Sequence, residues 1–568
     1  MTDYNQTVIL NGVDDFTIFD RTFSWDDGFI GRLRARLDDG DTGFAELVIR
    51  NDIDIDLAKF NGDPASTMVI REEGTGDRFI NLLRLPDGGS EVTLPETELN
   101  IVRGFEGDHD IALGQFVNFV QLGEGDDALR VSEGGRHAAM GGGNNIVEIA
   151  GGNLQNVKFE SGDNTLILRE GAFFESVQAN DGNNTFVLED GFGQLTFGSG
   201  SNEVTFARGY GGSITGYSND DSVNSITLGG DAALRSLGVS NGRDTLTLDA
   251  GASIEQAQLG SGDDVAIVGQ GASIGALGLG SGDNRLQIEG GQIDGVLAFG
   301  GDDVVRMSGQ GRAEVLQLGG GANEVVTAGR FVQGIYTFEG DDRVTVGSGG
   351  AGMVKLDAGN NTILARGFVD AVVTFDGTDA VSIGGGARYV GTGDGADTLL
   401  LGYQGIALAD AGQGDDLIRV GFLAADQGMR IEGGGGIDTI DMAFVGGDLD
   451  VTLGQGNFLE ERGFYALSGI ENLIAGRGAD RLAGDGADNA LTGGDGADVF
   501  VFDRDGGSDT ITDFTLGEDL IRLDGVSSAA QVSFDRQGDD VLVGYFDTEI
   551  LVQSVTVAQL ARVDNFEL

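Results

Sequence analysis

One polar position recurs through most of the chain inside glycine-rich loops. An Asp or Asn returns there every 18 to 22 residues in a single register. Carboxylate and amide oxygens are hard ligands, and glycine turns expose backbone carbonyls, so these loops have the chemistry that Ca2+ prefers. The positions, which we call the column residues, are Asp127, Asn145, Asn164, Asn184, Asn202, Asn224, Asp244, Asp264, Asn284, Asp303, Asn323, Asp342, Asn361, Asp379, Asp397, Asp416 and Asp438.

The chemical identity of the column residues changes along the chain in blocks. They are all Asn over 145–224, alternate between Asp and Asn over 264–361, and are all Asp over 379–438. Stacked about 4.8 Å apart, carboxylates repel one another unless a cation lies between them, whereas Asn amides form a neutral ladder. We therefore hypothesise that the need for calcium rises along the chain. In the alternative interpretation, Asp and Asn are interchangeable polar turn residues.

Each loop is followed by the pattern of a short strand. Apolar residues lie two and four positions after the column residue, as Leu166 and Leu168 do after Asn164, and a second apolar pair, such as Val157 and Phe159, precedes the next loop. This period of two places one face of each strand in a core. One coil of two strands and two turns cannot cover its apolar face, but stacked coils can. The sequence therefore predicts an all-β parallel β-solenoid.

The beginning of the chain differs from the repeats. All three prolines, Pro64, Pro86 and Pro95, precede the repeats. Proline has no N–H group, and a strand that pairs on both sides needs its N–H groups, so proline is not expected within the repeats. Residues 1–115 are expected to form a β-rich cap or assembly module, because the end of a solenoid needs a cover. An independent ligand-binding domain is the alternative. Residues 116–445 are predicted to form a solenoid of about 19-residue coils with the acidic loop on one side only.

Composition narrows the classes of partner and site. The chain has 34 Lys and Arg against 92 Asp and Glu, and this net charge of −58 disfavours nucleic acid and anionic membranes as partners. It has no Cys, which excludes disulfides and thiolate metal sites. The two histidines, His109 and His137, are expected at the surface or in loops. The sequence contains no run of about 18 apolar residues, so we expect no transmembrane insertion. The start lacks the pattern of a cleaved N-terminal signal.

Near residue 433 nonapeptides begin to recur. GGGGIDTID, AGRGADRLA, AGDGADNAL and GGDGADVFV follow the pattern G-G-x-G-x-D-x-U-x, where U is a large apolar residue, with departures at the first Gly and at Ala490. This stretch resembles the haemolysin-type calcium-binding repeats of the RTX (repeats-in-toxin) family. The resemblance implies an RTX β-roll at 446–513, with calcium between successive turns on both sides. Asp480 and Asp498, 18 residues apart, are expected on one side and Asp488 on the other.

The resemblance also implies a route out of the cell. Residues 514–568 look like the C-terminal cap and uncleaved signal of substrates of the type I secretion apparatus. Scarce calcium in the cytosol would keep the repeats unfolded, and millimolar calcium outside would fold them. The calcium ligands implied by the loops and the resemblance are Asp264, Asp303, Asp342, Asp379, Asp397, Asp416, Asp438, Asp480, Asp488, Asp498, Asp509 and Asp513.

Several classes of function compete. We expect a secreted, non-enzymatic, calcium-binding structural or cell-surface protein, such as an S-layer, matrix or adhesin-like protein, that self-assembles or binds a cell-surface glycan. The alternative is a secreted RTX enzyme that acts on polysaccharide or protein through an unrecognised site. No HExxH motif occurs, and carboxylate pairs are too abundant to identify a glycosidase. A pore-forming toxin would need long apolar or amphipathic helices, and the regular Thr array of an ice-binding face is broken at Arg285 and Arg343.

Overall fold

A computed structural model describes most of the chain from residue 68 onward. The chain divides into two compact units, Met1–Asp294 and Gly295–Leu568, and each is described by itself. The described residues are 7–10, 16–18, 21–23, 29–30, 33–36, 46–50, 53–55, 58–61, 68–76, 78–217, 219, 221–402, 405–421, 428–454, 456–459 and 463–567. No helix among them is long and apolar enough to cross a membrane.

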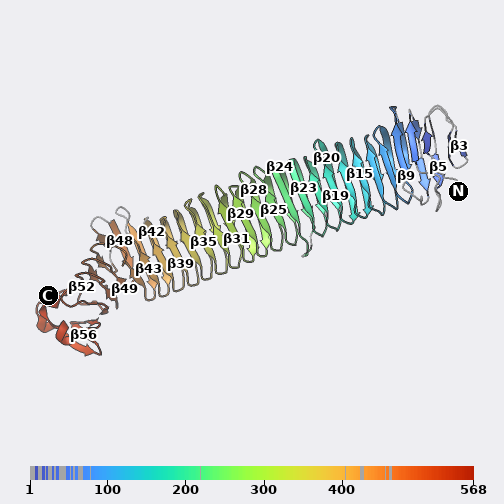
Figure 1. Ribbon diagram of the computed structural model, residues 1–568. Coiled ribbons are helices and arrows are strands. Elements are labelled where there is room, and N and C mark those ends of the chain that lie inside the picture. Colours follow the sequence, from blue (N-terminus) through green and yellow to red (C-terminus); the bar gives the residue numbers. More distant parts are fainter. Residues whose placement is uncertain are drawn as a thin grey trace. The chain divides into compact units, whose positions relative to one another are not determined.

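The first unit is a stack of parallel coils around a thin core. On one side β17 (Ile146–Ile149), β19 (Thr165–Leu168) and β21 (Thr185–Leu188) pair in parallel. On the other side β18 (Gly152–Ser161) pairs with β20 (Ala172–Ala179), also in parallel. Each strand thus pairs with the equivalent strand one coil away, and the strands follow one another in chain order (Figure 1). This is the parallel β-solenoid that the repeats predict.

The second unit continues the same rule and then changes near its C-terminal end. Here β35 (Arg343–Val346), β37 (Thr362–Ala365) and β39 (Ala380–Ile383) form parallel pairs in register. After the last coils, an antiparallel meander replaces parallel stacking, and its last strand pairs with β53 (Ser508–Ile511). The meander consists of β55 (Ser533–Gln537), β56 (Asp540–Tyr545) and β57 (Thr548–Val552).

The C-terminal coils also contain a separate five-stranded sheet, in which neighbouring strands run parallel. Its members are β46 (Asp450–Thr452), β50 (Arg481–Ala483), β52 (Val499–Phe502), β54 (Leu520–Leu523) and β58 (Phe566–Glu567). One four-residue α-helix, α1 (Val557–Leu560), lies among the described residues. The described chain is therefore nearly all β, as the sequence predicts.

We predicted that the solenoid begins at residue 116, but parallel stacking already starts before that residue. The strands β9 (Met68–Glu73), β11 (Ser90–Leu94), β13 (His109–Leu113) and β15 (Ala128–Val131) pair in parallel, each with the next. The stretch before 116 therefore already contains coils. Much of the predicted cap or assembly module, including most of residues 1–45, lies outside the described residues.

Apolar side chains from both strands of each coil fill the core. Leu166 and Leu168, two and four residues after a column residue, are both fully buried. Further along, the rings of Phe174 and Phe192 stack with centroids 5.3 Å apart, and Phe206 meets Phe192 edge-on at 5.0 Å. Such aromatic pairs add to the large apolar area that each ring removes from water. The core therefore depends on rings that reach from one coil to the next.

Phe174 and its neighbour Phe173 provide a test of this core, because one ring is fully buried and the other is 38% exposed. We expect Phe174→Ala to lower the free energy of unfolding of the first unit by about 3–5 kcal/mol, since it leaves a cavity. Phe173→Ala should lower it by about 1 kcal/mol or less. Urea unfolding followed by circular dichroism measures both, and equal losses would contradict the packing described.

Candidate metal site in the stacked column

Within each unit the column residues are buried along one edge of the stacked coils. All seventeen have at most 2% of their surface exposed. A glycine usually turns the loop inward just before them: Gly262, two residues ahead of Asp264, has a φ of +128°. A Cβ at Gly262 would lie 1.7 Å from the backbone oxygen of Gly242 in the preceding coil, so only glycine fits there. Close approach of the loops thus brings each column side chain beneath its neighbour.

A hydrogen bond from one coil to the next fixes each column side chain. The backbone N–H of Asn145 donates to Oδ1 of Asn164 at 3.1 Å, and the N–H of Asp397 donates to Oδ1 of Asp416 at 2.7 Å. Asn and Asp both place an oxygen at this point, so the bond forms with either residue. The column therefore ties successive coils together whatever its charge.

In the Asn coils the second side-chain atom is satisfied as well. Nδ2 of Asn184 donates to the backbone oxygens of Asn180 at 3.2 Å and Gly182 at 3.1 Å, both in its own loop. It also lies 3.0 Å from Oδ1 of Asn202 in the next coil. Asn145 repeats the same three contacts. This is the neutral amide ladder predicted for the Asn block, and it requires no ion.

In nine Asp coils the second side-chain atom is a buried oxygen that lacks a donor, whereas Oδ2 of Asp480 and of Asp519 accepts a backbone N–H group. Oδ2 of Asp264 is buried without a hydrogen-bond partner among the described residues. An Asn at this position would turn an NH2 group toward the loop carbonyls, whereas Asp turns a second oxygen toward them. A buried oxygen in that position is costly unless a proton or a cation satisfies it. The same holds for Oδ2 of Asp127, Asp244, Asp379, Asp397, Asp416, Asp438, Asp498 and Asp509.

Two of these coils carry a threonine beside the carboxylate. Burial raises the pKa of Asp379 and Asp397, and hydrogen bonding by the neighbouring Thr374 and Thr392 side chains opposes the rise. In the structure each threonine hydroxyl donates to a backbone oxygen at 2.8 Å. A hydroxyl has one hydrogen, so it serves either this backbone oxygen or the carboxylate.

Burial shifts the protonation of the column carboxyl groups toward neutral pH. It raises the pKa of Asp264 to about 8, opposed by the hydrogen bond from the Asp244 N–H and assisted by the negative charge of Asp263. Burial likewise raises the pKa of Asp416 and Asp509 to about 7. Near pH 7 such groups are close to the balance between holding a proton and holding a cation.

The C-terminal coils have a column on both sides, as the β-roll prediction implies. On one side the N–H of Asp480 donates to Oδ1 of Asp498 at 2.8 Å, and the N–H of Asp498 donates to Oδ1 of Asp519 at 2.9 Å. On the other side the N–H of Asn489 donates to Oδ1 of Asp509 at 3.0 Å. All five residues are buried. The one-sided arrangement of the long repeat array thus becomes two-sided here.

Asp488 lies on the other side, as expected, where its Oδ1 accepts the N–H of Ser508 at 2.8 Å, but it is exposed. Asn489, which directly precedes β51 (Ala490–Thr492), takes the buried position instead. Asp513 differs in another way, because its two oxygens accept the N–H groups of Gly493 and Gly494 at 2.9 and 2.8 Å. The other ten predicted ligands are buried column residues.

His109 also takes a column position, contrary to the expectation of a surface or loop histidine. It is buried, its N–H donates to Oδ1 of Asp127 at 2.9 Å, and its Nδ1 lies 2.9 Å from the hydroxyl of Ser90. Burial lowers its pKa to about 4, so the ring is neutral at pH 7. His109 lies 18 residues before Asp127, and this spacing, which recurs between later column residues, could have shown that His109 takes a column position. His137 is exposed, as expected.

Sequence reasoning missed two further parts of the edge. Glu471 stands in for an Asp and accepts the N–H of Asp438 at 2.8 Å. In addition, many column residues are preceded by an exposed polar residue whose side chain accepts an N–H group from the following coil, so these hydrogen bonds run in the opposite direction. The N–H of Asn144 donates to Oδ1 of Asp126 at 2.7 Å, and the N–H of Asp126 to Oδ1 of Asp108 at 2.9 Å. The recurrence of a polar residue directly before the column is the signal for these hydrogen bonds.

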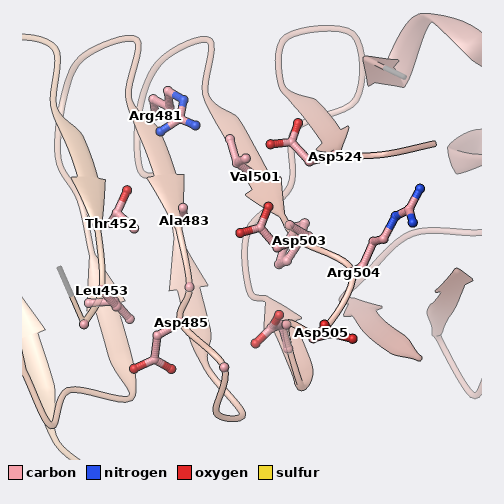
Figure 2. A pocket seen from close by; sticks show the side chains of 16 residues that line it. Thr452, Leu453, Arg481, Ala483, Asp485, Val501, Asp503, Arg504, Asp505 and Asp524 are labelled. Atoms are coloured by element: carbon pink, nitrogen blue, oxygen red, sulfur yellow. The ribbon is translucent and has the colours of Figure 1, made fainter. Parts of the chain in front are cut away.

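A cavity of about 700 Å3 lies beside Asp509 in the C-terminal coils. Figure 2 shows Asp485, Asp503 and Asp505 among the side chains that line it, close to the ends of β50 and β52. The cavity therefore gathers the oxygen donors that Ca2+ prefers. No group of three or more His, Cys, Asp or Glu side chains within the described residues forms a metal site alone. An ion here would need backbone or water oxygens as additional ligands.

One pattern of serine hydrolases escaped the sequence analysis. Residues 271–275 read GASIG, which matches G-x-S-x-G. In α/β-hydrolases the serine of this pattern lies on a sharp turn between a strand and a helix. Here Ser273 begins β28 (Ser273–Ser281) and pairs with Ser253 of the preceding coil. The pattern thus belongs to a coil and lacks the strand–turn–helix context.

Comparison with known proteins yields little. No family model and no curated protein matches the chain. Among solved structures, the extracellular lipase LipA from Serratia marcescens is 15% identical, with a TM-score of 0.16, over 41% of this chain and 40% of the lipase. The chain thus matches less than half of that lipase. At this TM-score the similarity carries no argument about activity, and the fold follows from the pairing of the coils.

The unpaired oxygen of Asp264 gives a direct test by amide substitution. In chelator at neutral pH, we expect Asp264→Asn to raise the free energy of unfolding of the first unit by about 1–3 kcal/mol, because an NH2 group replaces a buried oxygen that lacks a donor. The neighbouring Asp263 is exposed, so Asp263→Asn is the matched control and should change it by less than about 0.5 kcal/mol. A lower stability of Asp264→Asn in chelator would contradict the account.

The raised pKa values predict the pH dependence of the metal-free protein. Because the folded chain holds protons on groups such as Asp264 and Asp416 that the unfolded chain has released, stability is full below about pH 4 and falls as pH rises toward 8. In chelator, the thermal midpoint should therefore be higher at pH 5 than at pH 8. Calcium should reverse the trend, since it binds the deprotonated form. A midpoint in chelator that rises with pH would exclude this explanation.

Proposed function

We propose that this chain is an extracellular structural protein, of the cell surface or the surrounding matrix, whose solenoid is stabilised by calcium. The observation that carries the proposal is the series of buried column carboxylates whose Oδ2 atoms lack a hydrogen-bond partner. A cation between coils would satisfy these oxygens and neutralise part of the net charge of −58.

Calcium fits the donors better than other common metals. The chain has no Cys and only two His, so the available ligands are carboxylate, amide and carbonyl oxygens. The run of four Asp over 379–438 and the two-sided coils with Asp480, Asp498 and Asp509 would hold the ions. Bound calcium would supply positive charge between neighbouring carboxylates. The column carboxylates themselves orient each loop and transmit the stabilisation from coil to coil.

Several observations support an extracellular and non-enzymatic role. The nonapeptides resemble RTX repeats, and the C-terminal region resembles a type I secretion signal, which would deliver the chain to a calcium-rich medium. Repeated coils make up most of the described chain, and a repeat stack offers a long surface rather than one enclosed active site. We therefore favour an S-layer, matrix or adhesin-like protein over a secreted enzyme.

The three blocks of column residues predict graded dependence on calcium. In chelator, the Asp block over 379–438 should be cleaved at the lowest protease concentration. The alternating block over 264–361 should need a higher concentration, and the Asn block over 145–224 the highest. Limited proteolysis with and without calcium, with cleavage sites mapped by mass spectrometry, measures this order. Equal loss of protection in all three blocks would show that Asp and Asn are interchangeable here.

A chelator wash of intact producing cells tests the proposed location. We expect the wash to release the protein, and ordered sheets or fibres to re-form when calcium is restored. A wash with magnesium in place of chelator is the control. Protein found only in the culture medium, with none to release from cells, would contradict a surface role and favour a soluble effector or enzyme.

A further inference from the structure

A groove of about 350 Å3 lies on the first unit, at the turn where one side of four successive coils ends. It receives residues from β18 and β20, from β22 (Phe192–Phe197), and from the position directly after β23 (Glu203–Gly216). The side chains that give it its chemistry are Glu160, Gln178, Asn180, Asp181, Thr196 and Tyr217. None of these is a column residue.

The groove is held open by the backbone at Gly198, which lies between Asn180 and Tyr217. The N–H of Gly198 bonds to the coil before it at 3.0 Å, and the N–H of Tyr217 bonds to Phe197 O at 2.9 Å. A Cβ at Gly198 would lie 2.6 Å from Asp181 Oδ1 and 2.9 Å from the carbonyl carbon of Asn180. A side chain at Gly198 would therefore collide with Asn180 and Asp181, two of the residues that line the groove.

The walls of the groove combine an aromatic surface with polar groups. Tyr217 is 65% exposed. The polar side of the groove includes Gln178, whose Nε2 makes only a long contact of 3.5 Å to Asn180 Oδ1. The Gln178 amide is therefore available to a ligand. Asp181 accepts from the N–H and hydroxyl of Ser199 through Oδ1 alone, at 3.0 and 2.8 Å. The groove thus offers amide, carboxylate and hydroxyl groups beside one ring.

We propose that this groove binds a sugar ring of an uncharged glycan. The C–H face of a pyranose carries slight positive charge and packs against the negative face of an aromatic ring, here that of Tyr217. Hydroxyl groups on the ring edge need both acceptors and donors, which Asp181 and Gln178 supply. The Asp181 carboxylate and the acidic chain around the groove repel an anionic sugar, whereas the Glu160 carboxylate is paired with Nζ of Lys158 at 3.2 Å. The site goes beyond the calcium-dependent stack and involves no column residue.

Binding of the purified full chain to defined tetrasaccharides, in calcium-containing buffer, tests this proposal. The probes are neutral tetrasaccharides of glucose, galactose, mannose and N-acetylglucosamine, with a uronic acid tetrasaccharide for comparison, and titration calorimetry gives Kd. We expect at least one neutral probe to bind, and Tyr217→Ala to weaken its Kd at least tenfold. Tyr210, which is 56% exposed in β23, provides the control: Tyr210→Ala should change Kd less than twofold.

Gln178→Ala is the second variant and should also weaken binding of the same probe at least fivefold. Circular dichroism and protease resistance in calcium identify any variant that is misfolded. Absence of binding by all neutral probes, tighter binding of the uronic acid probe, or unchanged Kd in both Tyr217→Ala and Gln178→Ala would overturn the assignment. These outcomes are separate from the calcium proposal, because chelator-dependent stability of the wild-type chain is measured without any glycan.

Discussion

The fold depends on how one side-chain atom per coil is satisfied at the buried edge. Coils about 4.8 Å apart force each column side chain into contact with the next loop, and Oδ1 accepts the N–H that links the two coils. The other side-chain atom cannot reach water. When it is the nitrogen of Asn, loop carbonyls accept its hydrogens. When it is an Asp oxygen that no N–H group reaches, as in Asp264 and Asp416, a proton or a cation is needed to stabilise it.

This constraint separates the shape of the solenoid from its dependence on ions. Asn and Asp leave the backbone ladder unchanged, so the chain can vary the charge of each coil without changing the fold. In a stack, stability is close to a sum of coil and neighbour terms, so each Asp affects mainly its own coil and the next. We therefore expect ion dependence to be concentrated in the block of Asp over 379–438, and we expect the Asn block over 145–224 to be stable without metal.

Much of this arrangement could be predicted from the sequence, because stacking repeats one local rule in every coil. The period of Asp and Asn predicted that these residues line one edge, although not that they are buried, and the apolar pairs predicted the strands on both sides of the core. The nonapeptide pattern did not predict which residue of its turn is buried: it marks Asp488, whereas Asn489 directly precedes β51 and takes the buried position. The groove beside Tyr217 could not be predicted, because it depends on side chains from four coils and on the close contact of Gly198 with Asn180 and Asp181.

A crystal structure of the calcium-loaded chain at neutral pH, with anomalous scattering to locate the ions, tests the central claim most directly. The account predicts ions beside Oδ2 of Asp416 and Asp438 and none beside the side chains of Asn164 and Asn184. Loop carbonyls should complete the coordination of each ion. A column without ions, in which each Asp Oδ2 instead donates a proton to a loop carbonyl, would contradict it and would show that protons alone stabilise the buried edge.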